Sequence, residues 1–253
     1  MKELSLFSGA GGGLLGTTLL GWEHVGYVEY NDYCQRVIAQ RIEDGYLTRA
    51  PIFSDVRAFI SEGFAASYTG LVDVISAGFP CQPFSTAGKR QGADDSRNMW
   101  PATIECIRVV RPRYCLLENV PGLLSSGYFG TILGDLAESG YDARWRILSA
   151  AELGAPHKRD RLWIVANTTG SRWGDENKFQ DWGYLQSYKK WETRFASDLQ
   201  AVTDGRGLDS YNKDIRICDG IPGGVDRLKA IGNGQVAPVV AAVWGLLTDD
   251  FHT

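Results

Sequence analysis

The feature that most constrains the fold is the alternation of short β-rich runs with helical runs from residue 1 to about residue 166. Apolar residues recur at helical spacing between the β-rich runs, for example in residues 99–110 and 129–139. Strands that alternate with helices predict a mainly parallel sheet that is covered on both faces, and therefore an α/β protein. We expect strands at residues 4–7, 24–29, 72–77, 114–118, 144–149 and 162–166.

The composition changes near Asn167. From residue 167 to about residue 220 the chain is polar, aromatic and weakly periodic, which predicts a small separate region. The apolar pattern of residues 238–247 predicts a helix that packs back on the first domain. We therefore predict a first domain at 1–166, a small region at 167–220 and a returning C-terminal segment at 221–253.

Several classes of protein are disfavoured by the composition. No apolar stretch reaches the ~18 residues of a membrane span, and the N-terminus does not resemble a signal peptide, so we expect a cytoplasmic protein without a membrane partner. The five cysteines contain no CxxC pair, and the three histidines lie far apart in the sequence. This pattern argues against a disulfide framework and predicts that there is no metal site.

The net charge of −4 and the pI of about 5.5 disfavour a nucleic-acid partner when they are taken alone. Net charge averages over the whole surface, however, and the basic residues are concentrated in a few places. They gather in Lys89-Arg90, Arg108/Arg111/Arg113, His157-Lys158-Arg159 and Lys189-Lys190. A basic cleft on an acidic body is therefore compatible with the composition.

A glycine-rich turn, Ser-Gly-Ala-Gly-Gly-Gly at residues 8–13, follows the first strand and precedes a helix. Glycines let the backbone approach a ligand closely, and a helix N-terminus offers free N–H groups. Glu29 lies 20 residues after Gly9, where a carboxylate accepts hydrogen bonds from ribose hydroxyls. The pattern favours an adenosine-containing cofactor over a merely tight turn. Leu14 stands where a dinucleotide fingerprint requires glycine, which disfavours NAD.

Asp55 follows the short apolar stretch at residues 52–54 and is a further candidate for a cofactor contact at a strand end. An isolated aspartate in such a place is also a common helix cap. Both interpretations remain open from the sequence.

Cys81 lies in the segment Gly-Phe-Pro-Cys-Gln-Pro-Phe-Ser, residues 78–85, directly after the buried-type strand of residues 73–77. Loops at the carboxyl ends of parallel strands are where α/β folds bind ligands, and a thiolate is a strong nucleophile. Prolines on both sides of Cys81-Gln82 make the turn rigid, and residues 86–97 are expected to form a mobile lid. The remaining cysteines, 34, 106, 115 and 218, are interpreted as structural.

Residues 78–85, followed by Gly88-Lys89 and Asp95-Ser96-Arg97, resemble the nucleophile block of the DNA cytosine-C5 methyltransferase family. Each motif is short, but together they occur in that family's order and cover about residues 4–166 and 219–243. The other matching blocks are residues 7–12 for the cofactor, Glu118-Asn119-Val120, Arg159-Asp160-Arg161 and the final Gly232-Asn233.

The resemblance implies a Rossmann-like, doubly wound mixed sheet that binds S-adenosylmethionine and releases S-adenosylhomocysteine, with a small target-recognition region at 167–220. It implies that Cys81 is the nucleophile, that Glu118 acts at cytosine N3 and that Arg159 and Arg161 act near O2. The implied cofactor contacts are Phe7, Ser8, Gly9, Ala10, Gly11, Gly12, Glu29, Tyr30, Asp55, Val56, Pro80, Trp100 and Asn233. The candidate DNA contacts are Gln82, Ser85, Lys89 and Arg97.

The chemistry explains why these residue types are needed together. Cytosine C5 is a poor nucleophile, and addition of a thiolate to C6 makes it enamine-like. An acid at N3 and cations near O2 hold the developing charge, and the base must first be flipped out of the duplex. Glu118 follows an apolar strand, and Arg159 and Arg161 alternate along what is predicted to be one extended segment, so they are expected to point the same way.

Three departures from the family pattern and several alternatives remain. The block that usually precedes the final cofactor block is not recognisable in this sequence. His157 stands where the family usually has glutamine, and the region 167–220 is short for the family. The implied partner is double-stranded DNA, bound by a monomer; a cognate restriction endonuclease, phage protection and an orphan enzyme all remain open. The alternatives are a tRNA cytosine-C5 methyltransferase, a non-catalytic DNA-binding relative and an NAD oxidoreductase.

Overall fold

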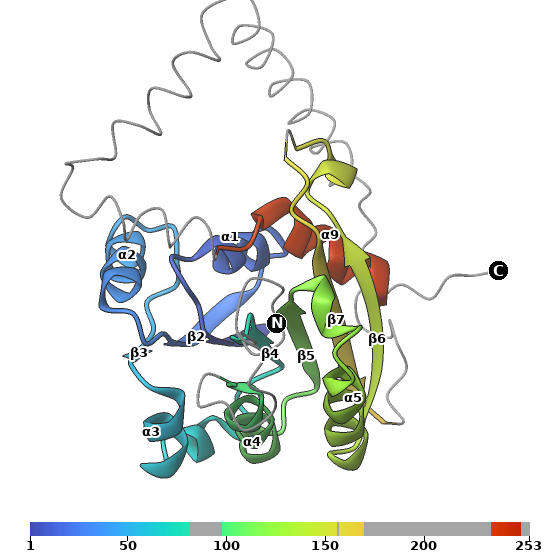
Figure 1. Ribbon diagram of the computed structural model, residues 1–253. Helices are drawn as coiled ribbons and strands as arrows, with labels where there is room; N and C mark the ends of the chain where they lie inside the picture. Colours follow the sequence, from blue (N-terminus) through green and yellow to red (C-terminus); the bar gives the residue numbers. More distant parts are fainter. Residues whose placement is uncertain (81–97, 156, 170–233, 249–253) are drawn as a thin grey trace, which may run out of the picture. The chain divides into compact units, whose positions relative to one another are not determined.

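The computed structural model describes residues 1–80, 98–155, 157–169 and 234–248, which belong to one compact unit formed by Met1–Trp173 with Asn233–Thr253 (Figure 1). Seven strands form one sheet in the order β3-β2-β1-β4-β5-β7-β6. The strands are β1 Lys2–Leu6, β2 Glu23–Val28, β3 Ile52–Phe53, β4 Val74–Ala77, β5 Tyr114–Asn119, β6 Tyr141–Leu148 and β7 Arg161–Thr168.

The first five strands are parallel, and β7 runs antiparallel to both of its neighbours, β5 and β6. The sheet is therefore mixed, and the predicted α/β class is confirmed. The division of the chain at residues 167 and 220 stays a prediction.

Helices cover both faces of the sheet (Figure 1). The helices α1, α2 and α9 lie on one face, and α3, α4 and α5 lie on the other. Their bounds are α1 Gly12–Leu19, α2 Asp32–Glu43, α3 Val56–Ser61, α4 Trp100–Val110, α5 Tyr128–Glu138 and α9 Ala237–Thr248. Short 3-10 turns occur at Ala65–Tyr68, Pro121–Leu123 and Ala151–Leu153. Within the described residues, no helix is both long enough and apolar enough to span a bilayer.

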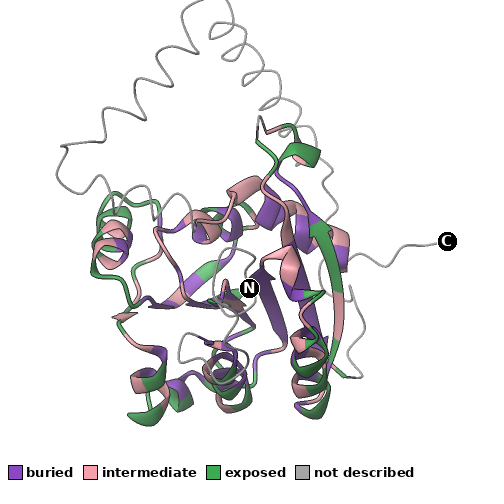
Figure 2. Cartoon of the chain, in the orientation of Figure 1, coloured by how far each residue is buried: buried purple, intermediate pink, exposed green. Residues whose placement is uncertain are grey.

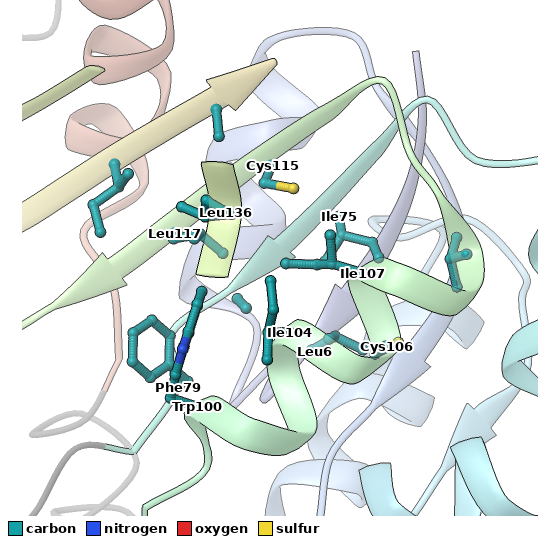
Figure 3. Packing of buried hydrophobic residues seen from close by; sticks show 14 of the residues in the cluster. Leu6, Ile75, Phe79, Trp100, Ile104, Cys106, Ile107, Cys115, Leu117 and Leu136 are labelled. Atoms are coloured by element: carbon teal, nitrogen blue, oxygen red, sulfur yellow. The ribbon is translucent and has the colours of Figure 1, made fainter. Parts of the chain in front are cut away.

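The strand β5 contributes side chains to two separate cores. Figure 2 shows this strand coloured as buried. It is buried along its whole length, and successive side chains of a strand point to opposite faces. Cys115 and Leu117 belong to the cluster under α4 and α5, where Figure 3 shows them with Ile104 and Ile107. Tyr114 and Leu116 belong instead to the cluster that α9 covers.

The helix α9 closes the second cluster, as the apolar pattern of residues 238–247 predicts. Trp244 meets the rings of Trp22 and Tyr114 edge-on, with centroid distances of 4.7 and 5.3 Å. Gly16 of α1 allows close approach, because a Cβ there would lie 2.6 Å from the Ala237 carbonyl oxygen. The end of the described chain is thereby fixed against its beginning.

Candidate active site

The candidate site lies where the carboxyl ends of β1, β4 and β5 meet. Phe7, Ser8 and Gly9 line a pocket there from the glycine turn, and Gly78 lines it from the end of β4. Glu118 contributes from β5, together with residues 234–235 just before α9. The pocket therefore brings together parts of the cofactor block and the Glu118 block, which are more than 100 residues apart in the sequence.

The glycine turn adopts a backbone that few side chains permit. Phe7, Gly9 and Gly11 have φ values of 54°, 57° and 90°. Gly11 is the N-cap of α1 and makes no side-chain hydrogen bond to the first N–H groups of the helix. Positive φ at Gly9 and Gly11 explains why glycine is required at these two positions.

Glu29 joins the turn to the end of β2. Its Oε2 accepts a hydrogen bond from the Gly9 N–H at 2.7 Å, and its Oε1 accepts one from the Asn31 N–H at 2.8 Å. Each carboxylate oxygen has capacity for a further bond, so Glu29 can still accept hydrogen bonds from ribose hydroxyls. The turn, the N-terminal end of α1 and Glu29 form a cradle that fits an adenosine cofactor, and the ribose contact stays a prediction.

Gly12 and Gly13 are constrained by close packing and not by a positive φ. An added Cβ on Gly12 would lie 2.3 Å from the Gln235 carbonyl oxygen, and one on Gly13 would lie 2.3 Å from the Gln235 Oε1. The sequence pattern suggested only that glycines admit a ligand. In the structure, these two admit the chain segment that precedes α9.

Glu118 and Arg161 form an ion pair at the base of the pocket. The Arg161 Nε lies 2.8 Å from the Glu118 Oε1, and both side chains are largely buried. Glu118 continues the face of β5 that carries Tyr114 and Leu116, so its carboxyl group lies on the side covered by α1 and α9. The structure thus brings together two residues to which the resemblance gives roles at one base, and those roles stay predictions.

Burial raises the pKa of Glu118 above the usual range of a carboxyl group. The positive charge of Arg161, a hydrogen bond from Gln235 and the charge of Arg159 oppose this shift and favour the ionised form. Because desolvation is the largest of these effects, Glu118 retains its proton to a higher pH than an exposed glutamate does. A carboxyl group of this kind is suited to donate a proton.

Arg159 departs from the predicted geometry. Its φ of 42° is left-handed, and β7 begins only at Arg161, so the two arginines do not alternate along one extended segment. Arg159 instead donates a hydrogen bond to the Gly234 carbonyl oxygen and still contributes positive charge near Glu118. The backbone turns at this point, which a simple period of two in the sequence does not reveal.

The other predicted cofactor contacts have varied surroundings. Tyr30 is 78% exposed beside Glu29, and Pro80 is exposed at the end of the β4 loop. The side chains of Val56 and Trp100 are buried in the core, where Trp100 packs on Phe79 (Figure 3).

Asp55 caps α3 by accepting a hydrogen bond from the Arg57 N–H at 2.7 Å, which confirms the capping interpretation. Cofactor contacts by Asp55, Tyr30, Pro80, Val56 and Trp100 stay predictions.

Several of the predicted site residues lie outside the described part of the chain. These are the proposed nucleophile Cys81, the candidate DNA contacts Gln82, Ser85, Lys89 and Arg97, and the cofactor residue Asn233. Within the described ranges, no group of His, Cys, Asp or Glu side chains has the arrangement of a metal site.

Gln235 was missed by the sequence analysis. Its Nε2 lies 3.5 Å from the Glu118 Oε2, and it is part of the pocket lining. The one available signal was a polar side chain two residues after Asn233, at the start of an otherwise apolar stretch.

Comparison with known proteins gives a consistent result. The profile of the family described as C-5 cytosine-specific DNA methylase matches residues 1–213. The type II methyltransferase M.NgoMIV of Neisseria gonorrhoeae is 31% identical over 99% of this chain and 72% of its own length. The type II methyltransferase M.AquIA of Picosynechococcus is 33% identical over 67% of this chain and 73% of its own length.

Solved structures share the fold. The S. pombe Dnmt2 methyltransferase superposes with a TM-score of 0.53 at 24% identity, covering 68% of this chain and 52% of that one. The chain thus spans about half the length of this structure, and only 40% of another relative, the type II methyltransferase M.NaeI of Lentzea aerocolonigenes.

Proposed function

Because the chain belongs to the C-5 cytosine-specific DNA methylase family, we propose that it transfers a methyl group to C5 of a cytosine in a specific duplex DNA sequence. The observation that carries this proposal is the buried Glu118–Arg161 pair beside the glycine turn. Glu118 supplies an acid with a raised pKa that lines the pocket, and Arg161 supplies a cation in contact with its Oε1.

In the proposed reaction, the Cys81 thiolate adds to cytosine C6 and forms a carbon–sulfur bond. Glu118 donates its proton to N3, which accepts the electron pair displaced by this addition. Arg161, with Arg159, stabilises negative charge that develops toward O2. After methylation, a base removes the C5 proton and the C6–sulfur bond breaks, which releases Cys81 as a thiolate. N3 then returns its proton to Glu118, which restores the neutral aromatic ring and the acid.

S-adenosylmethionine, the proposed cofactor, supplies a methyl group bonded to a sulfonium, which is an electrophile that enamine-like C5 attacks. Residues 7–12 and Glu29 would hold it through backbone N–H groups and a carboxylate. Tyr30, Asp55, Val56, Pro80, Trp100 and Asn233 are the further proposed contacts.

The DNA partner requires that the target base leave the stack, because C5 and C6 are inaccessible in a duplex. We assign Gln82, Ser85, Lys89 and Arg97 to this step, and residues 167–220 to target recognition. The relatives are named as type II methyltransferases, which supports a restriction–modification setting with a cognate endonuclease. We propose further that the protein acts as a monomer in the bacterial cytoplasm and uses no metal.

The test is a methyl-transfer assay with labelled S-adenosylmethionine, offered duplex DNA and tRNA in parallel. We expect incorporation into duplex DNA, located by bisulfite sequencing, and a loss of about 1,000-fold or more in Cys81→Ser. Labelling of tRNA alone would assign an RNA substrate instead. Undiminished transfer by Cys81→Ser would refute the covalent mechanism, and no transfer to either substrate would refute the activity.

A further inference from the structure

The side chain of Gln235 occupies a space that is open because two neighbours, Gly13 and Gly78, have no side chain. A Cβ on Gly13 would lie 2.3 Å from its Oε1, and a Cβ on Gly78 would lie 2.9 Å from its Nε2. This space ends at Glu118, whose Oε2 is 3.5 Å from the Gln235 Nε2. The amide therefore connects the glycine turn, the end of β4 and the buried acid.

The backbone around Gln235 is held independently of this side chain. Its carbonyl oxygen packs against Gly12, where a Cβ would approach to 2.3 Å, and Arg159 donates a hydrogen bond to the carbonyl of Gly234. A side chain at position 235 that only filled space would not need an amide group next to the Glu118 carboxyl oxygen. A preorganised donor at this place indicates a role in orienting the carboxyl group.

Glu118 needs such a second contact. Arg161 contacts Oε1 at 2.8 Å, and this single contact restricts the plane of the carboxyl group less than contacts at both oxygens would. A donor to Oε2 adds the second contact and keeps the group in the plane from which it must reach the base. A protonated carboxyl oxygen retains acceptor capacity, so Oε2 can accept from Gln235 while its proton faces the substrate.

We propose that Gln235 is a positioning residue for the reaction, whose amide holds Oε2 of Glu118 while Arg161 holds Oε1. The inference rests on the proposed function. The distance of 3.5 Å is long for a hydrogen bond, but catalytic contacts often shorten only when the substrate is bound. The contact has a measurable consequence, because a donor at Oε2 favours ionised Glu118 and its removal raises the pKa of that group.

The experiment compares Gln235→Met, which keeps an unbranched side chain but has no donor, with the matched control Gln40→Met. Gln40 is an exposed amide on α2 that also donates to a carboxylate, Asp44, at 2.8 Å. We expect kcat of Gln235→Met to fall about tenfold, with KM for DNA within about twofold. The basic limb of the pH profile of kcat should move to higher pH. Gln40→Met should match the wild type in all three.

A second readout does not depend on activity. Titration of the labelled Glu118 carboxyl carbon by NMR, assigned with Glu118→Gln, should give a higher pKa in Gln235→Met than in the wild type. An active wild type whose kcat, pH profile and Glu118 titration are all unchanged by Gln235→Met would overturn the positioning role. An inactive wild type whose Glu118 titration still moves would overturn the proposed function but leave the contact established.

Discussion

At the scale of single residues, the protonation state of Glu118 is the property most open to measurement. Burial raises its pKa, so the protonated acid is present at low pH and is lost as the pH rises through this raised value. A rate that needs the acid must therefore fall on the alkaline side. We expect Glu118→Gln to lower kcat about 100-fold or more and to lose that alkaline limb. Rate measurements across pH decide this, and a retained limb would place the titrating group elsewhere.

The cysteines provide a second residue-scale prediction. Burial raises the pKa of the Cys106 thiol to about 12 and that of Cys115 still further, so neither is a thiolate at neutral pH. Iodoacetamide should leave both unmodified in the folded protein and alkylate Cys81. Peptide mass spectrometry reads the outcome, with urea-unfolded protein as the control in which all cysteines react. Rapid labelling of Cys115 in the folded state would contradict its burial.

At this scale, the sequence predicted which residues are candidates for the reaction better than it predicted their conformations and contacts. The motifs named Glu118 and Arg161 as candidates because their residue types fit one reaction, but they did not predict that the two side chains form an ion pair. The conformation of Arg159 did not follow, because a positive φ at a non-glycine residue leaves no mark in residue spacing. Gln235 was missed because its role depends on Gly13 and Gly78, which approach it only after the chain has folded.

At the scale of elements, two helical glycines test the packing of α1 against α9. A Cβ on Gly16 would lie 2.6 Å from both the Ala237 carbonyl oxygen and the Val240 Cβ, whereas one on Gly134 of α5 would meet nothing within 4 Å. We expect Gly16→Ala to lower the free energy of unfolding by about 1–3 kcal/mol. Gly134→Ala should raise it by about 0.5–1 kcal/mol. Urea unfolding measures both, and equal effects would show that α9 does not constrain Gly16.

Most strands and helices were predictable because their apolar periodicity is strong. The predicted strand at residues 114–118 is β5 at Tyr114–Asn119, and the predicted helix at 99–110 is α4 at Trp100–Val110. The strand β3 has only Ile52 and Phe53, which are too few for an alternating pattern, although a strand end before Asp55 was expected. It exists because its backbone pairs with β2, a tertiary interaction that local sequence does not encode.

At the scale of the whole molecule, ligand binding should report on the cofactor. A ligand that binds only the folded state stabilises it by mass action, by about 2.7 kcal/mol at 100 times its Kd. We expect S-adenosylmethionine to raise the midpoint of thermal unfolding in proportion to the logarithm of its concentration. NAD at the same concentrations should have no effect. A shift with NAD instead would favour an oxidoreductase, despite Leu14.

Strand order is the whole-molecule property that could not be predicted from the sequence. Alternating strands and helices imply a parallel sheet but do not say which strands are neighbours. The strand β7 lies between β5 and β6 and runs antiparallel to both. Its position is set by backbone pairing across the sheet, in which Glu118 lies opposite Trp163. This reversal brings Arg161, at the start of β7, to the same edge as Glu118, at the end of β5.

The packing of α9 on α1 also has a consequence for biosynthesis. The helix α1 ends at Leu19, and the helix that covers it begins at Ala237. Ribosomes add about 5–20 residues per second, so a nascent chain exposes the glycine turn for about 10 s or more before its cover emerges. During that interval Glu118 has no amide from residue 235. A growing or prematurely terminated chain therefore lacks the Gln235 contact to Glu118, and the proposed activity would begin only once α9 has been translated.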